Sequence, residues 1–273
     1  MPSLLQVIIY TTLILYAVGA VLYFSGDMLS KVKVLKAAFI LALSGCVFNL
    51  LALIIRTIMV GRLPLSSGYE FVLSFTFITT ALYIIYEVRF KVKSAGGTVM
   101  LIAAALILSV VIMMKGQFGQ VSPLMPALKS PWLTIHVLTA AAAYAAFALA
   151  AGLAVRQLKK TAISVPEDII YKIVATGFVL LSLSIVLGAI WAEQAWGTYW
   201  SWDPKEVWAL VTWIIYAVYL HLYNRRKLSG NNASIIIIIG FALVLFTFFG
   251  VNFLIAGLHS YAGIWEYTAV TIS

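Results

Sequence analysis

Eight long apolar stretches occupy most of this sequence, and they constrain the fold more than any other feature. Each contains about 20 mostly apolar residues, the length that a helix needs to cross a bilayer. They cover approximately residues 4–24, 35–58, 69–87, 97–114, 132–155, 168–192, 206–223 and 234–256. Because lipid offers no hydrogen bonds, a spanning segment must be a helix or a barrel strand. Continuous apolar runs of this length exclude the alternating pattern of a strand.

The composition also favours the bilayer as the solvent of this chain. Hydrophobic residues make up 63% and charged residues only 10% of the 273 residues, whereas a soluble domain averages about 45–50% and about 25%. The first stretch has no Lys or Arg before it, so we expect a retained span rather than a signal peptide. No linker divides the chain. We therefore predict an all-α integral membrane protein with about eight transmembrane helices in a single domain, residues 1–273.

Basic residues are distributed unevenly over the loops between these stretches. Each odd-numbered loop carries three, which accounts for twelve of the eighteen Lys and Arg residues. The even-numbered loops carry only Arg62, Lys115, Lys129 and Lys205. The positive-inside rule then places the odd loops in the cytoplasm and both termini outside. This pattern also explains the net charge of +9 without a nucleic-acid partner.

The third even-numbered loop, residues 193–207, is the centre of a tryptophan cluster, and we call it the tryptophan segment. Six of the eight tryptophans lie between Trp191 and Trp213. Asp203 and Pro204 are typical of a helix N-cap and first turn, and Glu206 suits the positive end of the helix dipole. The cluster is either an interfacial aromatic belt or an outer shelf for a large planar apolar ligand. The residues proposed for this shelf are Trp196, Tyr199, Trp200, Trp202, Asp203 and Trp208.

The chain has three histidines, and two of them are predicted to lie level with the tryptophan segment. His136 is at the outer end of the fifth stretch, and His259 is at the outer end of the eighth. Imidazole is the common axial ligand of haem iron, and a six-coordinate haem needs two. We therefore predict that this pair holds a haem against the aromatic shelf. His221 lies fifteen residues into the seventh stretch, roughly 22 Å deeper at about 1.5 Å per residue, and it could equally hydrogen-bond to a neighbouring helix.

Other metal sites and other haem proteins fit these residues less well. Cys46 is the single cysteine, so the chain contains no CxxC motif. Few carboxylates lie close enough in sequence to the histidines to complete a zinc site. A membrane electron-transfer cytochrome also uses two histidines, but its ligands usually lie deep within facing helices. The outer pair lies at helix ends beside a polar loop, which better suits the transfer of haem to an external partner.

Arg56 is a charged residue within an otherwise apolar stretch, and such residues usually have a function. A haem propionate is one candidate partner, because an anion is costly to bury unpaired. Lys205 and Arg62 are weaker candidates for the same contact. Snorkelling to the outer interface is an alternative for Arg56. A further alternative is an ion pair with Glu70 that ties the second stretch to the third.

The tryptophan segment and its surroundings resemble a known family. Trp196 to Glu206, WGTYWSWDPKE, is similar to the WWD signature of haem-handling proteins in cytochrome c maturation. Segments 130–137 and 257–261 resemble those that carry the family's two external histidines, and His221 matches its transmembrane histidine. Segment 62–70 resembles a further family stretch. The WWD run is shared with CcmC and CcmF, but eight spans and the Pro-Lys-Glu ending favour the CcsA branch, also called ResC, over six-span CcmC.

This resemblance implies the haem-presenting subunit of the system II cytochrome c synthase, acting as a holocytochrome c synthase jointly with a CcsB-type membrane partner. Protohaem IX (haem b) would enter from the cytoplasmic side near His221 and move to the outer site, where His136 and His259 ligate it. Its vinyl groups would there form thioether bonds with the CxxCH thiols of apocytochrome c. The membrane would be the bacterial cytoplasmic membrane, or the thylakoid membrane if the source is a plastid.

The histidine count and the shared WWD run add two expectations to this implied function. Of the three histidines, two form the predicted outer pair and only His221 is left for an inner haem. We therefore expect the partner subunit to supply the second ligand of the inner haem iron. A haem exporter or chaperone of the CcmC kind is the alternative function. A b-type electron-transfer subunit is the third. The first two differ in whether this chain and its partner convert a CxxCH acceptor.

Overall fold

The structure is a computed structural model that describes residues 2–90, 93–121, 126–158 and 166–255. Within these residues, eight helices are long and apolar enough to cross a membrane, as the sequence predicted. The first seven are α1 (Pro2–Met28), α2 (Val32–Val60), α3 (Gly68–Phe90), α4 (Gly96–Met113), α5 (Pro131–Leu158), α6 (Glu167–Trp196) and α7 (Pro204–Asn224). The eighth consists of α8 (Gly230–Leu245), the π-helical turn η4 (Phe246–Gly250) and α9 (Val251–Leu254).

Local interactions set the end of α6 and the start of α7, the two helices that flank the tryptophan segment. α6 ends before Gly197, whose φ of 79° lies in the left-handed region that glycine adopts without strain. α7 begins at the predicted N-cap, because the Asp203 side chain accepts a hydrogen bond from the backbone N–H of Lys205 at 3.0 Å. The Glu206 carboxylate in turn accepts from the backbone N–H of Asp203 at 3.2 Å, which completes a capping box.

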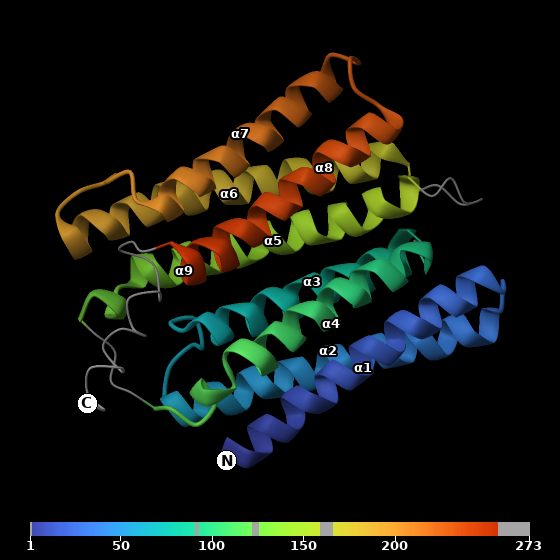
Figure 1. The fold of residues 1–273 in the computed structure, drawn as a ribbon, viewed down its shortest axis with the longest axis horizontal. Helices are drawn as coiled ribbons and strands as arrows, with labels where there is room; N and C mark the ends of the chain where they lie inside the picture. Colours follow the sequence, from blue (N-terminus) through green and yellow to red (C-terminus); the bar gives the residue numbers. More distant parts are fainter. Residues whose placement is uncertain (1, 91–92, 122–125, 159–165, 256–273) are drawn as a thin grey trace.

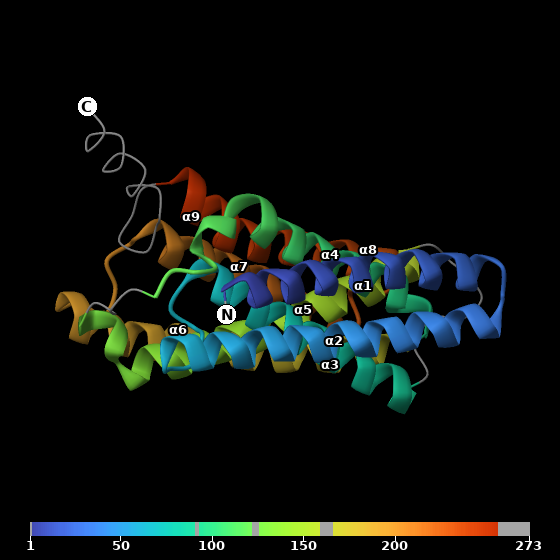
Figure 2. The same ribbon diagram turned by 90° about the horizontal axis from the view of Figure 1, so that it is seen from below.

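The helices form two groups that meet along α5 (Figure 1). One group consists of α1 to α4, and α5 packs against α3 and α4 of this group as well as against α6 and α8. α5 is rich in alanine, and small side chains let helices approach closely in lipid. It is accordingly the most buried of the eight described spans. The spans run roughly along the long axis of the molecule in two perpendicular views (Figure 1, Figure 2).

The connections between helices alternate between two ends of the molecule (Figure 1). The helix ends that the odd-numbered loops join lie at one end, which we call the basic end because those loops carry most of the Lys and Arg residues. The other end contains the start of α1 and the tryptophan segment, and we call it the tryptophan end. The fold therefore separates the odd loops from the even loops as predicted. The outward orientation of the tryptophan end stays a prediction from the charge pattern.

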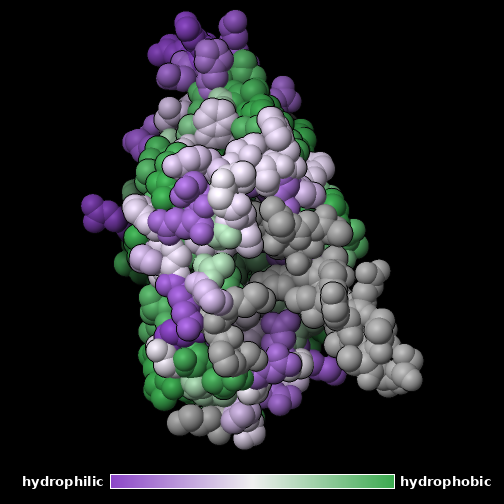
Figure 3. Space-filling model, turned by 90° about the vertical axis from the view of Figure 1, so that its left-hand side faces the viewer, coloured by the Kyte–Doolittle hydropathy of each residue, from purple (hydrophilic) through white to green (hydrophobic). Residues whose placement is uncertain are grey.

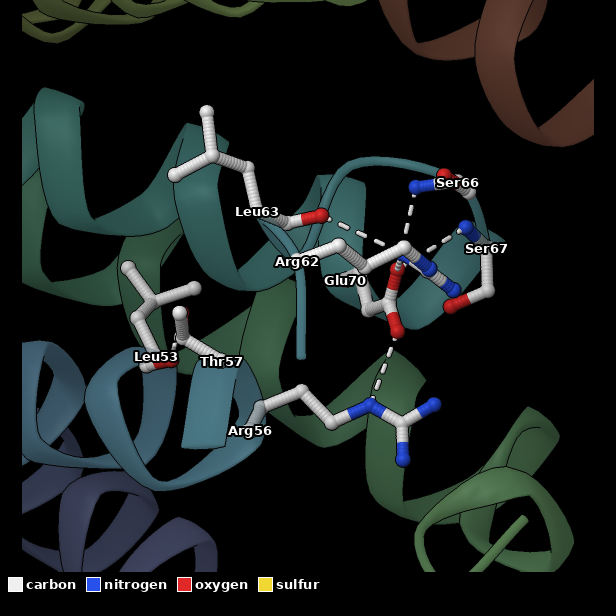
Figure 4. A network of polar contacts seen from close by, with 8 residues as sticks. All are labelled: Leu53, Arg56, Thr57, Arg62, Leu63, Ser66, Ser67 and Glu70. Atoms are coloured by element: carbon white, nitrogen blue, oxygen red, sulfur yellow. Dashed lines mark hydrogen bonds and ion pairs between the residues drawn. The ribbon is translucent and has the colours of Figure 1, made fainter. Parts of the chain in front are cut away.

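A buried ion pair connects α2 to α3 near the tryptophan end (Figure 4). Nε of Arg56 on α2 donates to Oε1 of Glu70 on α3 at 2.8 Å, and the two side chains are 4% and 0% exposed. Oε2 of Glu70 accepts from the backbone N–H groups of Ser66 and Ser67 and from Nη1 of Arg62. The structure thus pairs Arg56 with Glu70, which was one of the predicted roles for Arg56.

Candidate functional site

A cavity of about 470 Å³ lies between the helices at the tryptophan end. Its lining is mostly apolar and comes from α3, α5, α6, α7 and the last turns of the eighth span. The volume lies within the range of about 300–1,000 Å³ that is typical of small-molecule sites. Figure 3 views the molecule from this end, where hydrophilic side chains and side chains of intermediate hydropathy gather between hydrophobic flanks. We call this space the outer cavity.

His136 lines the outer cavity from the first turns of α5, and α6 holds its ring in place. Nδ1 of His136 lies 2.7 Å from the backbone oxygen of Ser184, and the Ser184 hydroxyl donates to the backbone oxygen of His136 at 3.2 Å. Because a carbonyl oxygen only accepts, Nδ1 is the donor in this contact, and Nε2 is the ring nitrogen that can offer a lone pair to a metal. A hydrogen bond of this kind fixes the tautomer and orientation of metal-ligating histidines.

Gly188, one helical turn after Ser184, makes room for the imidazole of His136. A Cβ atom at position 188 would lie 2.8 Å from both Cε1 and Nδ1 of the ring, closer than real Cβ atoms approach other atoms. On α6, Ser184 therefore hydrogen-bonds to His136, and Gly188 leaves the space that its ring occupies. Neither residue was predicted from the sequence. Small residues four apart are common in membrane helices, so their spacing is a weak signal.

The residues proposed for the aromatic shelf do not all face the outer cavity. Those that line it are Trp196, Tyr199 and Trp200. Trp202 lies outside the lining and is 69% exposed. Trp208 also lies outside it, within α7, and its ring packs against Phe246 with centroids 4.5 Å apart. Asp203 also lies outside the lining and is buried at the N-cap of α7, where its side chain caps the helix, so its place in the haem shelf stays a prediction.

The backbone of Trp202 has a φ of 58°, a left-handed conformation that is rare for a bulky residue. Glu206 maintains it, because one carboxylate oxygen accepts from the backbone N–H groups of Ser201 at 2.8 Å and Asp203 at 3.2 Å. These two groups flank Trp202 in the chain. The single carboxylate of Glu206 therefore fixes both the start of α7 and the outward direction of Trp202.

The remaining predicted residues lie apart from this cavity or outside the described residues. His221 is exposed on α7 near the basic end. His259 lies outside the described residues, so the proposed pairing with His136 stays a prediction. Arg56 does not line the outer cavity and pairs with Glu70 instead, so its contact with a propionate also stays a prediction. Lys205, a weaker candidate for that contact, does line the cavity.

The sequence of this chain is similar to a family model and to several known proteins, and all of them are named for cytochrome c assembly or biogenesis. The family model described as cytochrome C assembly protein matches residues 65–259. The cytochrome c biogenesis protein CcsA of Chlamydomonas reinhardtii is 35% identical over 226 residues, which cover 77% of this chain and 64% of that protein. The protein of the same name from Guillardia theta is 30% identical over 284 residues, which cover 92% of this chain and 94% of that protein.

Among solved structures, the cytochrome c haem lyase CcmF has a similar fold. The TM-score is 0.74 at 14% sequence identity, and the similarity covers 100% of this chain but 49% of the CcmF chain. The chain thus spans about half the length of that structure. At such low identity the likeness concerns the fold alone.

Proposed function

Because this chain belongs to the cytochrome C assembly protein family and is of the CcsA type, we propose that it holds haem in the outer cavity for attachment to apocytochrome c. A role in cytochrome c biogenesis follows from the family itself. The eight apolar helices make the chain a multi-pass membrane protein. The finer assignment rests on one observation: His136 and three aromatic residues of the tryptophan segment converge on one cavity of suitable size.

The residues around the outer cavity fit a haem. Aromatic faces suit a planar apolar ring, and Nε2 of a neutral imidazole is an axial ligand of iron. His136 would supply one ligand, and His259, which lies outside the described residues, would supply the second. Trp202 stands outside the cavity and is exposed, so we assign it to contact with the acceptor protein rather than with haem.

In this proposal the chain positions its substrates, while protohaem IX and the acceptor thiols carry the covalent chemistry. Each thiol of a CxxCH motif adds across one vinyl group: sulfur bonds to one vinyl carbon, and the proton ends on the other. The addition forms a thioether, expels no leaving group and transfers no net electrons. His136 would fix the position of the iron, and the apolar lining would keep water away from the vinyl groups.

Coexpression of the chain with a CcsB-type membrane partner and an apocytochrome tests this function. We expect haem staining of the acceptor that survives denaturation, because thioether bonds are covalent. An acceptor in which both CxxCH cysteines are replaced by serine is the control and should not stain. Haem bound to the chain without any stained acceptor would instead favour the haem exporter or chaperone.

We assign His221 to an inner haem position that the partner completes. His221 is exposed on α7, on the same helix face as the exposed side chains of Val218 and Ile214. α7 is also the least buried of the eight described spans. This face is open to another membrane subunit, so a histidine of the CcsB-type partner would provide the second inner ligand.

Haem spectra of the His136→Ala variant test the inner haem separately, because this variant lacks one of the proposed outer ligands. Purified with its partner, that variant is expected to show a six-coordinate haem that the additional change His221→Ala removes. Val218→Ala, on the same exposed face, is the matched control and should leave the spectrum unchanged. A six-coordinate inner haem in the chain purified alone would contradict the assignment, unless a methionine of this chain were shown to be the ligand.

A further inference from the structure

A lysine side chain points into the outer cavity and is held there by the eighth span. Lys205 lies in the first turn of α7, and its Nζ donates to Oδ1 of Asn252 at 3.1 Å. The same Nζ lies 5.8 Å from the ring centroid of Phe248, within the distance of a cation–π contact. All three residues line the cavity. Lys205 is thus directed toward the cavity and does not simply extend toward the membrane surface.

Asn252 adds an unused hydrogen-bond donor next to this lysine. Its side chain is 1% exposed, and Nδ2 has no hydrogen-bond partner among the described residues. A buried donor without a hydrogen-bond partner is destabilising, so a native chain rarely keeps one without a reason. Asn252 follows the π-helical turn Phe246–Gly250, a local widening of a helix that is frequent at functional sites.

Two carboxylates lie near this pair. Asp203 attracts the Lys205 ammonium, but it lies outside the cavity lining and caps α7 by accepting from the Lys205 backbone N–H. Lys205 is the only Lys or Arg among the described residues that line the outer cavity, and Glu206 is the only Asp or Glu. The Glu206 carboxylate accepts hydrogen bonds from the backbone of Ser201 and Asp203, and it is therefore fixed to the loop. An ammonium group has three donors, of which Asn252 uses one. Lys205 and Asn252 together thus offer several N–H donors to one ligand.

We propose that Lys205 and Asn252 form a carboxylate-binding site in the outer cavity, and that its ligand is a propionate group of haem. This proposal rests on the proposed function, since it names the atoms of haem that the cavity recognises. It assigns the propionate contact to Lys205 in preference to Arg56 and Arg62. Both arginines hydrogen-bond to Glu70, and neither lines the outer cavity.

Comparison of haem with its dimethyl ester tests this site, because the ester keeps the ring and iron but removes both negative charges. We expect the full chain, purified in detergent, to bind haem about 10–100-fold more tightly than the diester, as expected for charge-assisted hydrogen bonds. Lys205→Met is expected to abolish this preference. Lys129→Met is the matched control, because Lys129 lines a neighbouring groove and not the outer cavity, and it should keep the preference.

A second variant, Asn252→Asp, ensures that the test of the carboxylate site does not depend on Lys205→Met alone. Asn252→Asp places a carboxylate beside Lys205, so it should pair with the lysine, repel a propionate and also remove the preference for haem. Thermal unfolding of each variant establishes that it is folded at the temperature of the titration. Equal affinity of the unmodified chain for haem and diester would overturn the proposal, as would a preference that persists in Lys205→Met and Asn252→Asp.

Two further measurements distinguish the possible failures. Anionic phospholipid headgroups share the chemistry of a propionate, so the titration is repeated with added phosphatidylglycerol. Loss of the preference upon this addition would assign the pair to lipid and overturn the proposal. Insensitivity of the bound-haem spectrum to His136→Ala would refute the proposed function of the cavity. A spectrum that does depend on His136, combined with equal binding of haem and diester, would refute only the carboxylate site.

Discussion

Replacing His136 with alanine is expected to reduce the yield of haem-stained acceptor by at least about tenfold. Loss of a residue that merely orients a metal ligand typically lowers affinity or activity by about 10–100-fold, and loss of the ligand itself should cost more. The reason lies in the geometry of the ring. The Ser184 carbonyl holds Nδ1 at 2.7 Å, so the imidazole is oriented before haem arrives.

Two measurements check this result: the haem stain of the acceptor, and the absorption spectrum of haem bound to the purified complex. The spectrum should lose the features of histidine ligation at the outer site. The His259→Ala variant should behave in the same way if the two residues are a pair. Unchanged spectra and unchanged acceptor yield in both variants would show that the outer site is assigned to the wrong residues.

Two glycine variants test whether the position of the His136 imidazole matters when the imidazole itself is still present. Gly188→Ala keeps His136 but places a Cβ atom 2.8 Å from its ring, so the imidazole must move. Gly177→Ala is the matched control, because its Cβ atom would lie 2.8 Å from the ring of Phe147 on the same pair of helices but away from the cavity. We expect reduced acceptor yield and an altered haem spectrum only in Gly188→Ala.

Replacing Glu70 with alanine is expected to destabilise the protein by about 3–5 kcal/mol, the usual cost of leaving one member of a buried ion pair without its partner. Arg56 would lose its hydrogen bond to Oε1 at a site where it is 4% exposed, and its Nη1 already has no hydrogen-bond partner among the described residues. The backbone N–H groups of Ser66 and Ser67 at the start of α3 would also lose their acceptor. Unfolding by sodium dodecyl sulfate in mixed micelles measures the change.

Two control variants test whether the unpaired charge of Arg56 causes the destabilisation in Glu70→Ala. Arg62→Ala removes a more exposed member of the same network, 23% exposed, and should cost only about 0–1 kcal/mol. The double variant Arg56→Met with Glu70→Leu removes both charges. It should be much less harmful than Glu70→Ala, because a buried ion pair can often be replaced by apolar residues. Equal destabilisation by Glu70→Ala and Arg62→Ala would contradict this account.

The spans and their ends could be predicted closely from the sequence. The seventh helix begins at the predicted N-cap Asp203, because a cap, a proline and an acidic residue at this spacing act on their own backbone. The π-helical turn within the eighth span was not predicted. The mostly apolar stretch from 234 to 256 continues through it with only Thr247 and Asn252 as polar residues nearby. Such residues are ordinary in membrane helices, so they gave no signal for the widened turn.

The candidate site was predictable only in part. His136 and the aromatic residues of the tryptophan segment were found because their side chains are unusual beside an apolar helix. Ser184, Gly188 and Asn252 were missed because small and neutral polar residues are ordinary in membrane helices. Their roles depend on partners far away in the chain: Ser184 is 48 residues from His136, and Asn252 is 47 residues from Lys205.

The sequence alone thus determined the number of spans and the grouping of the basic loops. Both are properties of segments in contact with lipid or water, and each segment responds to that solvent independently of the others. Only the tertiary structure decided which helix faces meet, and therefore that Lys205 lies in the same cavity as His136 while Arg56 pairs with Glu70. Lipid is as apolar as the helices, so these contacts depend on close packing and hydrogen bonds between surfaces rather than on hydrophobicity.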